Sequence, residues 1–204
     1  MVASHGTLMH RATEWFVRQP PSAASVRSAV SDLTASGRRR TCPDAASVRD
    51  HRSVMTSVRR ATASDAEALA DLYLRALNAA SAYIPTVHTD DEVRWFIVER
   101  VVPRMETWLA VDSEDQPIGM LVLDAAFVDQ LYVEPTLTGR GIGTELLELA
   151  KRERPAGLRL WTFEANFGAR RFYERHDFSA RDRTDGDNEQ GVPDVLYVWD
   201  GDDR

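Results

Sequence analysis

The sequence predicts an α/β domain over residues 56–204, in which helices flank a mixed sheet. From Val58 onward, short runs of β-branched and apolar residues alternate with amphipathic segments. Helix capping signatures, such as Thr89 followed by Glu92, precede two of the amphipathic segments. Three glycines, Gly139, Gly141 and Gly143, then join a strand pattern directly to a helix pattern. Together these features favour one α/β domain of ordinary size.

The elements can be assigned in chain order. After the strand at Val58, Ser64 and Glu67 form a capping-box pattern that predicts a helix over 65–80, and Thr89 opens a second helix that lasts until Pro103. The polar turn at 113–116 predicts a hairpin. The remaining order is β, β, β, α, β, α, β, β, with strands over 107–112, 118–123 and 127–133, a helix over 142–152, a strand over 158–163, a helix over 167–175, and strands over 178–183 and 195–199.

Residues 1–55 differ from the rest in composition and charge. They are rich in Ala, Ser and Arg, lack sustained apolar periodicity, and carry a net charge of +4 from eight arginines against four acids. We predict a disordered basic extension that the domain does not need, with a basic arm or a transit-like peptide as the functional alternative. The whole chain carries −7, which leaves −11 for the domain. This acidic balance disfavours nucleic acid as a partner and favours cationic substrates.

Several function classes are disfavoured by composition. Cys42 is the only cysteine, so an internal disulfide and a thiolate-rich metal site are excluded. The five histidines show no metal-binding spacing, and we expect no metal. His88 and His176, each near a helix boundary, are interpreted as caps or surface residues rather than bases. No apolar run approaches the roughly 18 residues of a membrane helix, so we expect a cytoplasmic protein that does not bind membranes.

The glycine-rich segment VEPTLTGRGIGTELLELA, residues 133–150, suits an anion site. Glycines let backbone N–H groups converge at the N-terminus of the following helix, where the helix dipole attracts negative charge. The segment is not a P-loop, because GxxxxGK[ST] is absent, and Thr144 and Glu145 stand where a dinucleotide fingerprint needs its third glycine. Tight packing of helix on strand is the alternative explanation. An anion site of this kind would suit a pyrophosphate.

Two segments carry a family resemblance. VEPTLTGRGIGTELL resembles the acetyl-CoA signature [QR]xxGx[GA] of the GNAT superfamily of N-acyltransferases, with Gly141 and Gly143 at its small positions and Thr138 at a position usually held by Gln or Arg. EANFGARRFYERHDF, residues 164–178, resembles the second cofactor segment of that family, with Asp177 in place of the usual glycine. The matching residues there are Asn166, Ala169, Phe172, Tyr173 and Phe178. The resemblance covers residues 58 to about 200.

The resemblance implies a fold, a cosubstrate and a site. It implies a mostly antiparallel sheet of six to seven strands with about four helices, splayed at its central strands to admit CoA. It also implies transfer of the acetyl group of acetyl-CoA to a primary amine, of a small molecule or a protein, and relatives are often homodimers. The residues expected to bind the cofactor are Leu131, Tyr132, Val133, Thr138, Gly139, Arg140, Gly141, Ile142, Gly143, Thr144 and Asn166.

The catalytic roles are assigned to two residues. Tyr173 matches the tyrosine that acts as general acid in many relatives, and packing against Phe172 is its structural alternative. Phe127 stands where relatives often place a glutamate base, and Asp129 is the substitute candidate because the period of two puts it on one strand face with Phe127 and Leu131. A substrate-binding or capping role for Asp129 stays open, as does proton transfer through water. Polar residues near the closing hairpin and one tyrosine are substrate-binding candidates, with a solvated acidic hairpin as the alternative: Tyr83, Asp185, Asn188 and Glu189.

Two other kinds of function are compatible with parts of this pattern. A non-catalytic acyl-CoA-binding module would keep the glycine loop and lose the chemistry, and Phe127 supports it whereas Tyr173 does not. A protein that binds another nucleotide through the glycine loop is disfavoured by the missing P-loop lysine and ribose-binding acid. An N-acetyltransferase is therefore the leading prediction.

Overall fold

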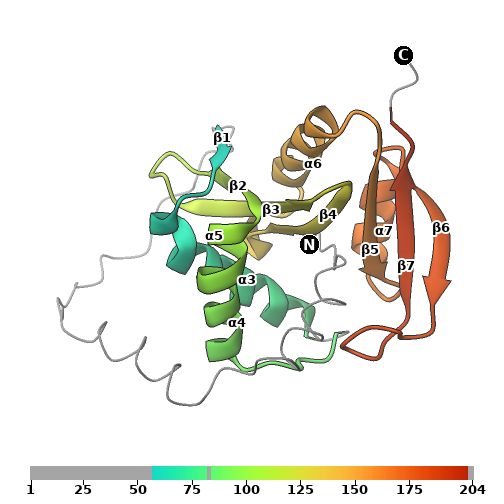
Figure 1. The fold of residues 1–204 in the computed structure, drawn as a ribbon, viewed down its shortest axis with the longest axis horizontal. Helices are drawn as coiled ribbons and strands as arrows, with labels where there is room; N and C mark the ends of the chain where they lie inside the picture. The colour runs from blue at the N-terminus through green and yellow to red at the C-terminus, as the bar shows by residue number, and fades with distance from the viewer. Residues whose placement is uncertain (1–56, 82–83, 202–204) are drawn as a thin grey trace, which may run out of the picture.

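The computed structural model describes residues 57–81 and 84–201, and its elements follow the predicted order (Figure 1). The predicted extension over 1–55 and the candidate Tyr83 lie outside the described residues. The helices are α3 (Ala66–Ala80), α4 (Asp90–Phe96), α5 (Val102–Arg104), α6 (Ile142–Glu153) and α7 (Phe167–Glu174). The strands are β1 (Ser57–Arg60), β2 (Glu106–Val111), β3 (Pro117–Asp124), β4 (Phe127–Val133), β5 (Leu158–Phe163), β6 (Ser179–Thr184) and β7 (Asp194–Trp199).

The described strands form one seven-stranded sheet in the order β1-β2-β3-β4-β5-β7-β6. Every neighbouring pair is antiparallel except β4 and β5, which run parallel because the chain crosses over through α6 between them. The prediction of a mixed, mostly antiparallel sheet of six to seven strands is confirmed. The parallel pair at its centre is the feature that matters for function.

The parallel strands β4 and β5 separate almost at once. Their ladder pairs one position, Phe127 with Arg159, and the Arg159 N–H donates to Ala126 O at 2.9 Å. Towards Val133 the two strands no longer pair, so the β4 backbone edge that faces β5 is open along most of its length. Figure 1 shows β5, β7 and β6 turned away from β2, β3 and β4. The sheet is therefore splayed between β4 and β5, as predicted.

Helices cover both faces of the sheet. On one face α3 and the α4 segment bury Leu69, Leu72 and Ile97 against β2, β3 and β4, in a cluster that includes Tyr132. On the other face α6 and α7 bury Leu146 and Phe172 in a second cluster. Gly119 on β3 lets α6 approach closely, because a Cβ there would lie 2.9 Å from the Ile142 and Leu146 side chains. Apolar burial on this scale is the main source of stability.

One local prediction at a helix end was wrong, and a second was off by one residue. The capping box is formed by Thr62 and Asp65, ahead of a 3-10 turn at Ala63–Asp65, and not by Ser64 and Glu67. The second helical segment continues past Pro103 to Arg104, after a π-helical turn at Ile97–Val101. Pro103 closely follows the π-helical turn and lies in the last part of this continuous helical segment, which ends one residue later at Arg104. Thr89 and Glu92 do form the predicted capping box.

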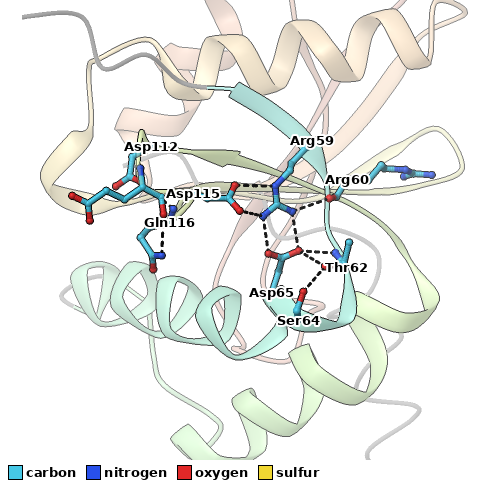
Figure 2. A network of polar contacts seen from close by, with 9 residues as sticks. Arg59, Arg60, Thr62, Ser64, Asp65, Asp112, Asp115 and Gln116 are labelled. Carbon is cyan, nitrogen blue, oxygen red and sulfur yellow. Dashed lines mark hydrogen bonds and ion pairs between the residues drawn. The ribbon is translucent and has the colours of Figure 1, made fainter. Parts of the chain in front are cut away.

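A polar network links β1 to the start of α3 and to the turn between β2 and β3 (Figure 2). The Arg59 guanidinium donates to both carboxylate oxygens of Asp65 at 2.9 Å and to those of Asp115 at 3.1 Å. The N–H and hydroxyl groups of Thr62 also donate to Asp65, each at 2.7 Å. Hydrogen bonds from Arg59 and Thr62 hold the pKa of Asp65 well below its usual range. Asp65 is buried, and its charged hydrogen bonds with Arg59 link β1 to the start of α3.

Asp65→Asn is expected to lower the free energy of unfolding by about 1.5–3 kcal/mol at neutral pH, the usual value of hydrogen bonds to a charged group. The lowered pKa means that this contribution is complete above about pH 4, the unfolded value, and is lost as pH falls towards the folded value. The free energies of unfolding of the wild type and of Asp65→Asn, measured in urea from pH 7 downward, should therefore converge in acid. Asp71→Asn, which removes an exposed partner of Arg94, is the control, with an expected loss below about 1 kcal/mol. Equal losses for both variants would contradict this account.

Candidate active site

The segment 138–144, called here the phosphate cradle, leads from β4 into α6. Gly139 and Gly141 have φ values of 82° and 87°, which favour glycine, and a Cβ at either would meet nothing within 4 Å. The hydrogen bonding of α6 begins where the Glu145 N–H donates to Gly141 O at 3.0 Å. The N–H groups of the first helical turn, from Ile142 to Thr144, therefore have no acceptor within the helix. The cradle presents these donors at the positive end of the helix dipole.

A cavity of about 420 Å³ opens onto the cradle. Its walls come from the end of β4, the cradle and one side of α7, and are formed by Val133, Leu137, Thr138, Gly139, Gly141, Ile142, Gly143, Thr144, Gly168, Arg171, Phe172, Arg175 and His176. Of the predicted cofactor residues, Arg140, Leu131, Tyr132 and Asn166 do not line it. The Arg140 N–H instead points back to Leu137 O at 3.4 Å.

Sequence reasoning missed the arginines of this cavity. Arg171 and Arg175 both line it, and each brings a fixed positive charge to a cavity whose other wall carries N–H donors. Their spacing of four on a helix, with Gly168 one turn earlier, was the available signal. Arginine suits phosphate because its planar group donates two parallel hydrogen bonds. The cavity therefore has the donors that a pyrophosphate requires.

His176 joins the two helices that form the cavity. Its Nδ1 lies 2.8 Å from Phe172 O, and its Nε2 lies 3.1 Å from the Thr144 hydroxyl in the first turn of α6. A neutral imidazole with its proton on Nδ1 satisfies both contacts, because it donates to the carbonyl and accepts from the hydroxyl. His176 thus fixes α7 against the cradle, as a structural residue rather than a base.

Asn166 stands at the N-terminus of α7, beside the split in the sheet. Its Oδ1 accepts from the Ala169 N–H at 3.0 Å and caps the helix. Its Nδ2 is buried and has no hydrogen-bond partner among the described residues. A buried donor without an acceptor is costly, so an acceptor on a ligand would complete it. The orphan donor of Asn166 and the open edge of β4 fit the amide-rich arm of CoA, and the cradle fits its phosphates.

Tyr173 lies on α7 with its ring fully buried. The ring packs edge-on against Phe172 at 5.2 Å between centroids and tilted against Phe178 at 5.7 Å. Tyr173 therefore does pack against Phe172, which was the structural alternative considered for it. Burial, followed by the nearby phenols of Tyr73 and Tyr173, raises the pKa of Tyr132 on β4 well above its usual value. The Tyr173 phenol is therefore close enough to Tyr132 of β4 for the two groups to interact.

The predicted strand face of Asp129 was wrong. A β-bulge interrupts the pairing of β3 with β4, since Val122 pairs with Gln130 but the next residue, Leu123, pairs with Val128. Asp129 is the extra residue of this bulge, which breaks the alternation that would place it with Leu131. Its carboxylate contributes, after burial as the main cause, to the raised pKa of Tyr73 on α3. The Gln130 Nε2 donates to Asp129 Oδ2 at 3.3 Å.

The structure separates the substrate candidates of the β6–β7 connection. Asp185 is exposed, and Asn188 is occupied inside its own loop, where its Nδ2 donates to Val192 O at 2.7 Å. Glu189 instead turns inward, and its Oε1 lies 2.6 Å from the Nε2 of His88, which precedes α4. This hydrogen bond to Glu189 raises the pKa of His88. His88 is therefore a partner of a buried carboxylate, which no local pattern could reveal because the two residues are 101 positions apart.

Two kinds of feature are absent from the described part of the chain. No described helix is long and apolar enough to cross a membrane. Within residues 57–81 and 84–201, no group of three or more His, Cys, Asp or Glu side chains gathers as metal ligands would. The expectation that the protein needs no metal stays a prediction.

A sheet splayed beside a helix N-terminus that is built for phosphate defines a CoA-dependent acyltransferase fold. Residues 103–180 match the family described as acetyltransferase (GNAT) domain. The chain is 27% identical over 135 residues to a peptidyl-lysine N-acetyltransferase, YjaB, of Salmonella typhimurium, in a match that covers 66% of this chain and 91% of the relative.

Solved structures agree in fold. The solution structure of apo YjaB from Escherichia coli is 26% identical, with a TM-score of 0.58 over 71% of this chain and 95% of that one. The PaiA N-acetyltransferase of Thermoplasma acidophilum, solved with coenzyme A, is 20% identical, with a TM-score of 0.53 over 70% of this chain and 97% of that one. The chain belongs to the GNAT superfamily. It is an N-acetyltransferase, which transfers an acetyl group to an amine.

Proposed function

We propose that this enzyme transfers the acetyl group of acetyl-CoA to the ε-amino group of lysine side chains in proteins or peptides. The observation that carries the proposal is the splayed sheet, with the phosphate cradle at the end of β4 and the buried carboxylate of Asp129 in the bulge of the same strand. The name of the YjaB relative, a peptidyl-lysine N-acetyltransferase, supports the choice of acceptor. The acidic domain, with its net charge of −11, also favours a cationic acceptor. A cytoplasmic location stays part of the proposal.

Each part of the donor has residues that suit it. The N–H groups of the cradle and the guanidinium groups of Arg171 and Arg175 would hold the pyrophosphate. The Asn166 Nδ2 and the open edge of β4 would hold the arm that carries the sulfur. When bound, acetyl-CoA supplies the acyl group as a thioester, whose carbonyl carbon is open to attack by a neutral amine. A backbone N–H of β4, with that of Leu131 as the candidate, would stabilise the negative charge that develops on the carbonyl oxygen.

Two proton transfers complete the reaction. The acceptor arrives as an ammonium group and must lose a proton before its nitrogen forms the new C–N bond, and the buried Asp129 carboxylate is the proposed base. As the C–S bond breaks, the departing sulfur takes up a proton, which the Tyr173 hydroxyl is proposed to give. A phenol and a thiol have similar intrinsic pKa values, about 10 and 8.5, so this transfer is feasible. Asp129 lies in the bulge of β4, and Tyr173 lies on α7 in the cluster that α6 and α7 form on the cradle side.

The acceptor class is tested with two peptides of one sequence. In the first, the N-terminus is blocked and one lysine is free, and in the second, the lysine is replaced by norleucine and the N-terminus is free. With acetyl-CoA, mass spectrometry should find acetylation of the lysine peptide and little of the other. Acetylation of the N-terminal peptide alone would refute the lysine proposal. Acetylation of neither peptide, with turnover on a small polyamine, would point to a metabolite as the acceptor.

A further inference from the structure

The loop between α3 and α4 meets the β6–β7 connection on the face of the sheet opposite the cradle. Figure 1 shows both segments at the same end of the molecule, below β4 and β5 in that view. The contact is polar, because His88 from the first loop and Glu189 from the second are 2.6 Å apart between Nε2 and Oε1. The side chain of Glu189 is 10% exposed and that of His88 is 19% exposed. The contact is therefore an interior one.

The contact with His88 uses only one of the two carboxylate oxygens of Glu189. Its Oε2 is buried and has no hydrogen-bond partner among the described residues. A buried carboxylate oxygen without a donor is costly, and His88 satisfies only the other oxygen. Such an oxygen is retained where a ligand supplies the missing donor. A donor with positive charge would satisfy both the hydrogen bond and the charge.

Glu189 also lies near the reacting strand. Burial, and then the charges of Asp129 and Glu189, raise the pKa of Tyr73, and the loops that carry His88 and Glu189 pack through Ile84 and Val192 in one cluster with Ala80 of α3 and Phe163 of β5. The Tyr73 ring packs edge-on against Tyr132 of β4 at 4.7 Å between centroids. Glu189 therefore belongs to the acceptor side of the strand along which the donor is expected to lie. Two negative groups next to β4 suit a primary ammonium, which offers three donors and a full charge.

We propose that Glu189, positioned by His88, is the residue that binds the ammonium group of the acceptor and selects cationic primary amines. The inference rests on the proposed function and assigns separate roles to the two carboxylates. Glu189 recognises the charged amine as it enters, and Asp129, deeper on β4, takes the proton. Glu189 should then govern the KM for the amine, whereas the KM for acetyl-CoA depends on the cradle on the other face.

The test is steady-state kinetics of E189Q with the blocked lysine peptide. Glutamine keeps the size of the side chain and an oxygen for His88 but removes the charge. The KM for the peptide should rise by about ten- to a hundredfold, the usual worth of one charged hydrogen bond, with the KM for acetyl-CoA unchanged. D187N removes an equal charge from an exposed residue of the same loop, and its KM should stay within about twofold. Equal peptide KM values for E189Q and D187N would overturn the inference.

A second measurement needs no variant. Calorimetry on the wild-type enzyme saturated with CoA should show the lysine peptide binding at least about tenfold more tightly than its blocked norleucine counterpart, which lacks only the ammonium. Equal affinities would also overturn the role of Glu189. The two proposals fail in different ways: a wild-type enzyme inactive on lysine refutes the proposed function, whereas an active enzyme with an unchanged peptide KM in E189Q refutes only this inference.

Discussion

Replacing Gly141 by Asp should weaken acetyl-CoA binding by more than about a hundredfold while the protein stays folded. Gly141 has a φ of 87°, and a Cβ there would meet nothing within 4 Å, so the new side chain clashes with no part of the protein. The left-handed conformation costs an aspartate about 1–2 kcal/mol, which a folded domain tolerates. The carboxylate would stand at the N-terminus of α6, where phosphates are expected, and would repel them in the space that the glycine leaves open.

Calorimetric titration with acetyl-CoA measures this effect, and Gly191 offers a matched control. Gly191 lies in the β6–β7 connection, also has a positive φ, 63°, and likewise leaves at least 4 Å of open space around the position of a Cβ. G191D thus introduces the same strain and the same charge away from the cradle. It should bind acetyl-CoA with nearly wild-type affinity. If G141D bound as tightly as G191D, the assignment of the cradle to phosphate would be wrong.

Replacing Tyr173 by Phe should lower kcat by about 10²–10⁴-fold, the range typical of a lost general acid, with little change in acetyl-CoA affinity. The change removes one hydroxyl and keeps the ring that packs against Phe172 and Phe178. Without the phenol, the sulfur would leave as a thiolate in a buried site, where an unsolvated anion is costly. The loss should therefore appear in turnover and not in donor binding.

Release of free CoA thiol gives the rate, and Y197F is the control. Tyr197 is buried on β7 beside Tyr173, with ring centroids 6.2 Å apart, and its hydroxyl donates to Glu174 at 2.7 Å. Removing that hydroxyl makes the same chemical change outside the proposed reaction path, so kcat should stay within several-fold of the wild type. A Y173F enzyme with the kcat of Y197F would rule out Tyr173 as the acid.

Sequence reasoning predicted the fold well because each element has a local signal. The strands at 127–133 and 158–163 and the start of α6 at Ile142 agree with the structure, since apolar periodicity and the glycine junction mark them directly. The capping box was misplaced by two residues because Thr62 and Asp65 compete with Ser64 and Glu67 for the same pattern. The hydrogen bonds from Arg59 to Asp65 are visible only in the structure.

The two halves of the site differed in how well they could be predicted. The cradle is contiguous in sequence, so its glycines were found at once, although the regularly spaced Arg171 and Arg175 were missed. The acceptor side depends on contacts between distant segments and on a bulge. A period of two cannot anticipate the extra residue at Asp129, and no pattern connects His88 with Glu189. Long-range polar pairs of this kind form because the fold brings distant segments together. A local sequence pattern does not indicate which segments will meet.

The most direct test of the central claim is the release of CoA thiol from acetyl-CoA by the wild-type enzyme, with and without the blocked lysine peptide. Acetyl transfer to an amine across the split between β4 and β5 predicts thiol release that depends on the peptide and matches, mole for mole, the acetyl-lysine found by mass spectrometry. Tight binding of acetyl-CoA with no amine-dependent thiol release, on this peptide or across a broad panel of amines, would contradict it and leave a protein that only binds acyl-CoA.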